Sequence, residues 1–142
     1  MEAIRESIRA FLAESGIPHR EDPPGVFHIT DYRPDGSPFV TVVSADRGWV
    51  NLASGVASRI QGNARPIAKF LDKAMNLNPE RPLAKYGTTE NGGFVLTANY
   101  PAHVHSEWFL SDHLMDVRNA QCEEVPRLLE EGQQLGVKFR FE

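Results

Sequence analysis

Three histidines are the residues whose type and spacing come nearest to a metal site. His103 and His105 flank Val104, and His113 follows on a predicted helix. A catalytic zinc centre needs three protein ligands and an open fourth position. The chain offers neither a His-Glu-x-x-His motif nor a pair of cysteines to complete such a set. We therefore expect these histidines to cap a helix or face solvent, and a small metal-dependent enzyme is kept as an alternative function.

The possible nucleophiles form no recognisable catalytic motif. Ser44 and Ser54 lie in predicted strands, without the Gly-x-Ser-x-Gly turn of serine hydrolases. Cys122 is the one cysteine and is predicted on an apolar stripe of a helix, where we expect a buried, unreactive thiol. The glycines are isolated and form no phosphate-binding loop. The sequence thus predicts no catalytic residue, no cofactor and no small-molecule substrate.

The charged residues argue against direct binding of nucleic acid. The chain has 15 basic and 19 acidic residues, a net charge of -4, and no two adjacent basic residues. A nucleic-acid surface usually shows a basic excess or a basic run. Arg59, Arg65 and Lys69 could form a small basic patch, but solvated charges beside a helix are the simpler expectation. An accessory factor that acts through a nucleic-acid-binding partner protein is a second alternative.

Length, cysteine usage and hydropathy indicate a cytoplasmic protein of one domain. At 142 residues, 41% apolar and 24% charged, the chain has the size and composition of one globular domain, residues 1–142 with a short tail at 132–142. A single cysteine excludes an intrachain disulfide and fits a reducing compartment. The charged start of the chain lacks the apolar run of a signal peptide, and no segment is long enough to span a membrane.

The first half of the chain predicts one helix and a three-stranded meander. Apolar residues recur at helical spacing over residues 2–15, and the polar, proline-rich stretch 19–24 is expected to be a loop. Three runs with strand character follow, at 26–32, 39–44 and 49–56, joined by short turns. Consecutive strands with such short connections must be antiparallel.

The second half predicts a helix, a hairpin and a final helix. A connector at 59–64 leads into a helix that Asn63 caps and Asn78-Pro79 ends. Strands at 83–88 and 94–100 form a hairpin through Asn91-Gly92-Gly93.

The final helix is expected to run from the cap Ser106 to Glu131, before Gly132, and Pro126 should bend or divide it. Residues 135–141 form a short strand or an ordered tail. The predicted class is α+β, with an antiparallel sheet (meander plus hairpin) and elements in the order α-βββ-α-ββ-α.

Two apolar stripes on the final helix carry the only functional signal. The first contains Leu110, Leu114, Val117, Val125 and Leu128, and the second contains Trp108, Met115, Cys122 and Leu129, spaced by seven. A single broad core face is the favoured interpretation. The alternative is that the second stripe, together with Trp49 of the third strand, meets a partner or a second copy, since Trp and Met are enriched at interfaces. An open sheet edge lined by Phe27, Tyr32 or Trp49 is a further partner surface.

Several short motifs occur along the chain: Trp49-Val50-Asn51-Leu52, Phe70-Leu71, Asn76-Leu77-Asn78, Lys85-Tyr86-Gly87, Asn91-Gly92-Gly93-Phe94-Val95-Leu96 and Tyr100-Pro101. These motifs resemble the YbjN-like family, whose fold is close to that of type III secretion chaperones, and the similarity spans most of the chain, roughly residues 26–129. The resemblance implies an α+β domain that is often dimeric and has no catalytic residues to transfer. The expected function is therefore a non-catalytic, homodimeric chaperone-like or adaptor protein that binds a segment of another protein, with no direct contact to nucleic acid or membrane.

Overall fold

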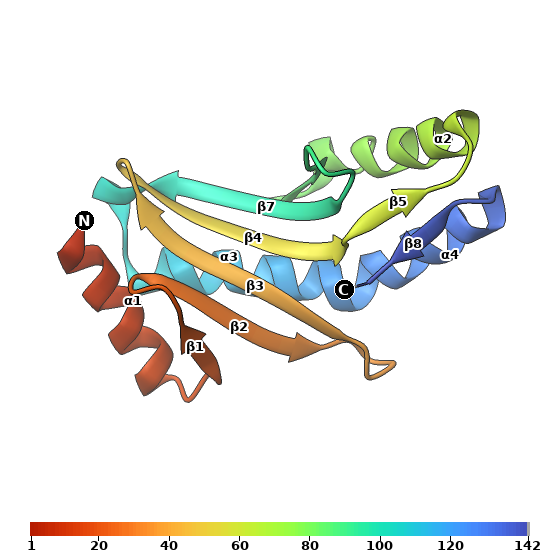
Figure 1. Ribbon diagram of the computed structural model, residues 1–142. Coiled ribbons are helices and arrows are strands. Elements are labelled where there is room, and N and C mark those ends of the chain that lie inside the picture. Colours follow the sequence, from red (N-terminus) through yellow and green to blue (C-terminus); the bar gives the residue numbers. More distant parts are fainter. Residues whose placement is uncertain (142) are drawn as a thin grey trace.

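The computed structural model describes residues 1–141 and is built around a six-stranded antiparallel sheet (Figure 1). Glu142, the last residue of the predicted tail, lies outside the described residues. The strands, in spatial order, are β1 (His19–Glu21), β2 (Val26–Tyr32), β3 (Pro38–Asp46), β4 (Trp49–Ala57), β7 (Phe94–Pro101) and β6 (Lys85–Thr88). The predicted meander and hairpin are confirmed, and they join through the pairing of β4 with β7.

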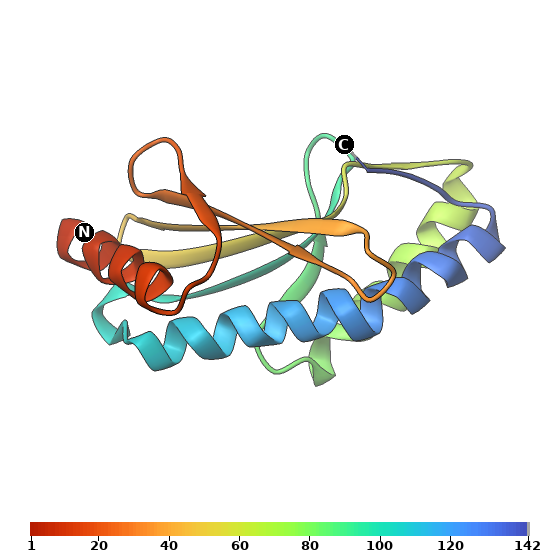
Figure 2. The ribbon, with the colours of Figure 1, turned by 90° about the horizontal axis from the view of Figure 1, so that it is seen from below.

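The helices and a second, two-stranded sheet complete the fold. The α-helices are α1 (Glu2–Glu14), α2 (Ala64–Met75), α3 (Glu107–Asn119) and α4 (Val125–Leu135), and the small sheet pairs β5 (Arg59–Gln61) with β8 (Lys138–Arg140). Short 3-10 turns cover Asn78–Glu80 and Ala102–Val104. Figure 2 shows α3 running along one side of the large sheet and α4 continuing past its end toward the two-stranded sheet, with no helix over the other side. No helix within residues 1–141 is long and apolar enough to cross a membrane.

The core lies between the large sheet and the helices. Side chains alternate along each strand, so that Phe27, Leu52 and Leu96 point toward the helices and are fully or almost fully buried. Leu110 and Val117 of α3 meet them from below. Burying each Leu or Phe contributes about 1.5–3 kcal/mol to stability, so the side chains between the sheet and the helices contribute strongly to the stability of the fold.

A smaller part of the core joins α2 and α4 to the two-stranded sheet. The ring of Phe70 lies 5.2 Å from that of Phe94 and 5.0 Å from that of Phe139, both edge-on. Gly132 of α4 faces these rings, and a Cβ at this position would lie 2.5 Å from Cζ of Phe139. The helix therefore uses a glycine at Gly132 for close packing.

The end of the last helix differs from the prediction. Gly132 lies inside α4, which continues to Leu135 and ends at Gly136, whose φ of +98° gives the left-handed C-terminal cap. Gly132, expected to follow the end of the helix, is instead a packing residue inside it, because close packing against aromatic rings requires a glycine as a helix stop does.

Pro126 divides the helix as predicted. A five-residue π turn, Ala120–Glu124, separates α3 from α4, and the proline lies in the first turn of α4. A proline in a helix interior lacks a donor and clashes with the carbonyl four residues before it. The wider π turn accommodates that clash, and the two helices continue in nearly the same direction (Figure 2).

Two strands arise where no strand was predicted. The stretch 19–24, expected to be a loop, contains β1, and the connector 59–64 contains β5. Both have only three residues and form through pairing with another segment: β1 with residues 27–29 of β2, and β5 with β8. Such short strands depend on pairing with another segment, and three residues are too few to establish an alternation of apolar and polar residues. Of the two alternatives for residues 135–141, a short strand or an ordered tail, the structure has the strand, β8.

Candidate protein-binding surfaces

The second apolar stripe is largely outside the core. Trp108 is 81% exposed and Met115 is 53% exposed, whereas Leu110 and Val117 of the first stripe are buried. Seven residues complete about two helical turns, so Trp108 and Met115 lie above one another, on the face of α3 turned away from the sheet. The favoured interpretation of one broad core face is therefore wrong for this part of the helix.

The lower half of the stripe is less open. Cys122 is half-buried, and its thiol lies 3.8 Å from the backbone oxygen of Tyr32. The expectation of a buried thiol is wrong, because the π turn brings Cys122 to the rim of the sheet beside the end of β2. Leu129 is half-buried and packs against the core. Only Trp108 and Met115 of this stripe thus offer a large exposed apolar surface.

The sheet side opposite the helices, which we call the open face, is almost uncharged. On the four central strands, β2, β3, β4 and β7, it carries the residues that alternate with the core residues: Val26, His28, Thr30, Tyr32, Pro38, Val40, Val42, Ser44, Asp46, Trp49, Asn51, Ala53, Gly55, Val95, Thr97, Asn99 and Pro101. Asp46 is the only charged residue in this set. An antiparallel sheet with one solvated side normally carries polar residues there. Here the polar residues on the four central strands are almost all uncharged.

Large apolar side chains mark both ends of the open face. Trp49, at the end where β3 turns into β4, is 45% exposed, and Tyr32 at the far end of β2 is 58% exposed. Val40 lies between them and is 40% exposed. Phe27, the third residue considered for a partner surface, is fully buried in the core. Trp49 is thus the predicted interface residue that belongs to this face.

The edges of the large sheet are short strands. β1 has three residues and β6 has four, and β1 covers β2 only as far as Ile29. The backbone of residues 30–32 therefore continues beyond β1 along an open edge. Short edge strands limit accidental pairing with other sheets, so the open face offers more contact area than the edges do.

A buried polar network fixes the helix below the sheet. The Arg33 guanidinium donates to Oε1 of Gln121 at 2.7 and 3.1 Å, and the Gln121 amide donates to Ser54 Oγ at 2.9 Å and to the Gly55 carbonyl at 2.8 Å. Gln121 lies in the π turn. Burial lowers the pKa of Arg33. Ser54 is part of this network and completely buried, so its hydroxyl has a structural role.

A second network holds the other flank of the helix. Arg81, whose side chain is 8% exposed, pairs with Asp116 and Glu124, each at 3.0 Å. The Tyr86 hydroxyl also donates to Glu124, and burial together with this carboxylate raises the pKa of Tyr86. Because these two networks fix both flanks of the helix, the exposed side chains of Trp108 and Met115 project from a rigid helix.

The three histidines lie in separate environments, and of the three only His103 is exposed to solvent as expected. His105 Nδ1 lies 2.9 Å from the Tyr100 hydroxyl and its Nε2 lies 3.0 Å from Ser7 Oγ. His113 is buried and donates from Nδ1 to the carbonyl of Phe109, while His103 is exposed. Within residues 1–141, no group of three His, Cys, Asp or Glu side chains could hold a metal ion. The alternative of a metal-dependent enzyme thus has no ligand set in this part of the chain.

Comparison with solved structures shows that the fold is shared with YbjN and with type III secretion chaperones. YbjN from E. coli has a TM-score of 0.60 at 11% identity, with 91% of each chain covered. A chain of the heterodimeric ExoU–SpcU complex from the Pseudomonas aeruginosa type III secretion system has a TM-score of 0.56 at 18% identity, covering 87% of this chain and 96% of that chain.

A third match is to the structure of the Yersinia pestis type III secretion chaperone SycH in complex with a stable fragment of a second protein. Its TM-score is 0.52 at 12% identity, and 93% of this chain and 98% of that chain are covered. No protein-family model and no curated protein matches the sequence. The likeness predicted from the short motifs is therefore confirmed as a shared fold, carried by very different sequences.

Proposed function

We propose that this protein is a non-catalytic, chaperone-like adaptor that binds an extended segment of a partner protein across the open face. The observation that carries the proposal is the low charge of that face: of its 17 positions on the four central strands, Asp46 alone is charged, while apolar side chains are exposed at both ends. Extensive, weakly charged surface that folding leaves unburied is typical of an interaction site.

The dimensions of the open face favour a segment over a globular partner. Six strands about 4.8 Å apart and about seven residues long outline a face of roughly 24 by 23 Å. That footprint, about 550 Å², is smaller than the roughly 800 Å² that each partner of a standard stable complex buries. An extended chain of about seven residues would cross all six strands. Ordering a flexible segment costs free energy, so we expect moderate affinity.

The shared fold supports this proposal. Two of the matched structures are complexes between different proteins, ExoU–SpcU and a secretion chaperone with a fragment of a second protein. A fold that hosts protein binding in those cases is suited to the same class of function here, although fold alone never specifies the partner.

We further propose that a second copy binds at the outer face of α3. Trp108 and Met115 provide its exposed apolar contacts, and the half-buried Cys122 and Leu129 border them. This surface and the open face lie on opposite sides of the molecule. A homodimer formed there would leave both open faces accessible to partner segments.

The test is affinity capture from a lysate of the protein's own cells, followed by quantitative mass spectrometry. Three baits are compared: the wild-type protein, Ala53→Lys in the middle of the open face, and Asn119→Lys on the exposed outer side of α3. We expect proteins that are enriched on the wild-type and Asn119→Lys baits and lost on Ala53→Lys. Enrichment that is equal on all three baits, or absent from all three, would overturn the proposal. The same data reveal whether the partner is a nucleic-acid-binding protein.

A further inference from the structure

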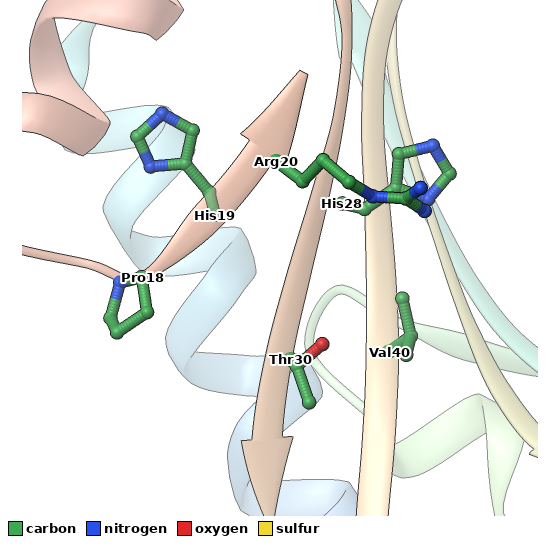
Figure 3. A pocket seen from close by; sticks show the side chains of 6 residues that line it. All are labelled: Pro18, His19, Arg20, His28, Thr30 and Val40. Carbon is green, nitrogen blue, oxygen red and sulfur yellow. The ribbon is translucent and has the colours of Figure 1, made fainter. Parts of the chain in front are cut away.

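A shallow pocket lies at one corner of the open face, where β1 lies beside β2 and β3. Its volume is about 310 Å³, and it is lined by Pro18, His19, Arg20, His28, Thr30 and Val40 (Figure 3). Arg20 is paired with His28 across β1 and β2, and Thr30 is paired with Val40 across β2 and β3. Paired residues of adjacent strands point to the same face, so the four side chains form two rows on the open face.

The ring of His19 does not belong to these rows. His19 is paired with the buried Ile29, and its ring lies 6.3 Å from that of Phe27, toward the core side of the sheet. Figure 3 shows the ring directed away from Arg20 and Thr30. The ionisable side chains that face the pocket are thus Arg20 and His28.

The guanidinium of Arg20 has donors to spare. Its side chain is 68% exposed, and its one ion pair within residues 1–141 is with Asp22 at 3.7 Å, beyond hydrogen-bond length. By contrast, Arg9 on the neighbouring α1 is held by both oxygens of Glu21 at 2.8 and 2.7 Å. Arg20 therefore extends across β2 toward His28 with its planar set of N–H groups open to another acceptor (Figure 3).

The ring of His28 is held in place beside that guanidinium. Its Nε2 lies 2.8 Å from the backbone oxygen of Asp22 and must donate, since a carbonyl oxygen only accepts. This bond ties the β1–β2 turn to the strand and fixes one wall of the pocket. Thr30 adds a hydroxyl group to the floor, while Pro18 and Val40 add apolar walls.

This combination fits a carboxylate carried on a short apolar stem. A guanidinium matches a carboxylate with two parallel hydrogen bonds, and the walls made by Pro18 and Val40 suit methylene groups. Across the open-face positions of β1–β4 and β7, Arg20 is the one cationic side chain among the described residues. Lys85 of β6, in register with Thr97, already donates to the carbonyls of Asn78 and Arg81. An acidic group of a segment lying on this face would therefore find its open cationic partner at Arg20.

We propose that this pocket binds a carboxylate of the partner segment, with Arg20 as the ion-pairing residue. The inference rests on the proposed function and specifies it: the preferred segments carry small or apolar residues and one acidic group placed at the β1 corner. The ion pair at this pocket would fix the position and direction of the bound segment. The flat face alone would let the segment bind at many positions along its length.

The experiment is a titration of the isotope-labelled full chain followed by two-dimensional NMR. N-acetylglutamate methylamide is compared with N-acetylglutamine methylamide, which has the same shape without the charge. We expect saturable shifts of the amide signals of Arg20, His28 and Thr30 with the glutamate compound, and binding about tenfold weaker with the glutamine compound.

N-acetylvaline, which has a free chain-end carboxylate, distinguishes the two possible sources of the bound carboxylate, a side chain or a chain end. Its binding would assign the pocket to chain ends as well as to side chains, and either result agrees with the proposal.

Two variants complete the test. Arg20→Gln should abolish the difference between the two compounds. The matched control is Arg47→Gln, because Arg47 is also an exposed arginine that lies 3.7 Å from a neighbouring aspartate, in the turn after β3. Equal responses to the charged and uncharged compounds, or an unchanged response of Arg20→Gln, would overturn the inference. Since no partner protein is involved, such a failure would leave the proposed function standing.

Discussion

At the scale of single residues, the imidazole of His105 joins three elements. Its two ring nitrogens form hydrogen bonds with Ser7 of α1 and Tyr100 of β7, and the ring stacks on that of Tyr100 with 5.9 Å between the centroids. Burial lowers the pKa of His105 below its ordinary value of 6.5 and raises that of the Tyr100 hydroxyl. The neutral ring is thus the form that the folded protein favours.

This position predicts a loss of stability in mild acid. As the pH falls through about 6.5, His105 of the unfolded chain gains a proton while the folded protein resists it. The unfolded state then binds more protons, so the free energy of unfolding decreases as the pH falls. Urea unfolding at pH 7.5, 6.5 and 5.5 measures the effect, and His105→Gln should flatten the curve over this interval.

The carboxylate of Glu21 titrates in a different interval. Arg9 and the backbone N–H of Gly25 lower the pKa of Glu21 to about 2 from 4.5, so its stabilising effect is lost only below pH 4.5. If the pH dependence between 7.5 and 5.5 is the same in His105→Gln as in the wild-type protein, the role assigned to this ring is wrong.

The buried Arg33–Gln121 pair shows why some residue roles cannot be predicted from sequence. Nothing in the neighbourhood of Arg33 in the chain indicates a buried guanidinium, because its main partner lies 88 residues away in the π turn. Gln121 itself is a polar residue in a helix, a common feature of an exposed face. Only the crossing of the helix below the β2–β3 hairpin brings the two together.

At the scale of elements, Gly132 is a packing residue inside α4. Its neighbours are the rings of Phe139 and Phe70, at 2.5 and 2.9 Å from a Cβ placed on it. Glycine in the interior of a helix normally costs about 1 kcal/mol relative to alanine. Its presence here is therefore explained by the close approach of α4 to β8 and α2.

Gly132→Ala should consequently destabilise the protein, against the usual helix preference. We expect a loss of about 1–3 kcal/mol in the free energy of unfolding, the usual cost of overpacking a filled core. Gly55→Ala is the matched control, since no atom lies within 4 Å of a Cβ built there. Chemical denaturation of both variants measures the difference. A stabilised Gly132→Ala would show that α4 is free to move away from the rings.

Elements whose own residues show a periodic apolar pattern could be predicted from the sequence. Elements that form only by pairing with another segment of the chain could not. The alternation of Phe94, Leu96 and Ala98 placed the faces of β7 correctly. Ser106 does cap α3, accepting from the Phe109 N–H at 3.2 Å. In contrast, β1 and β5 exist only through their pairing, and the spacing of Trp108 and Met115 did not say which side of the helix the sheet would cover.

At the scale of the whole molecule, two surfaces that expose large apolar side chains face opposite directions. The open face of the sheet carries Trp49, and the outer face of α3 carries Trp108 and Met115. The helix layer between them is fixed by Arg33 on one flank and Arg81 on the other. This arrangement allows the proposed self-association and the proposed partner binding to be separated by mutation.

Self-association through α3 predicts that Trp108→Ala raises the dimer dissociation constant without lowering stability. Trp108 is 81% exposed, so its removal opens no cavity. Leu129→Ala is the contrasting variant: Leu129 packs against the core, and its truncation should lower the free energy of unfolding by about 2 kcal/mol or more.

Sedimentation equilibrium gives the dissociation constants, and urea unfolding gives the stabilities. A wild-type protein that stays monomeric, or a Trp108→Ala variant that dimerises as the wild type does, would remove α3 as the dimer interface. Because the open face lies on the other side of the sheet, the loss of this dimer should leave partner capture intact.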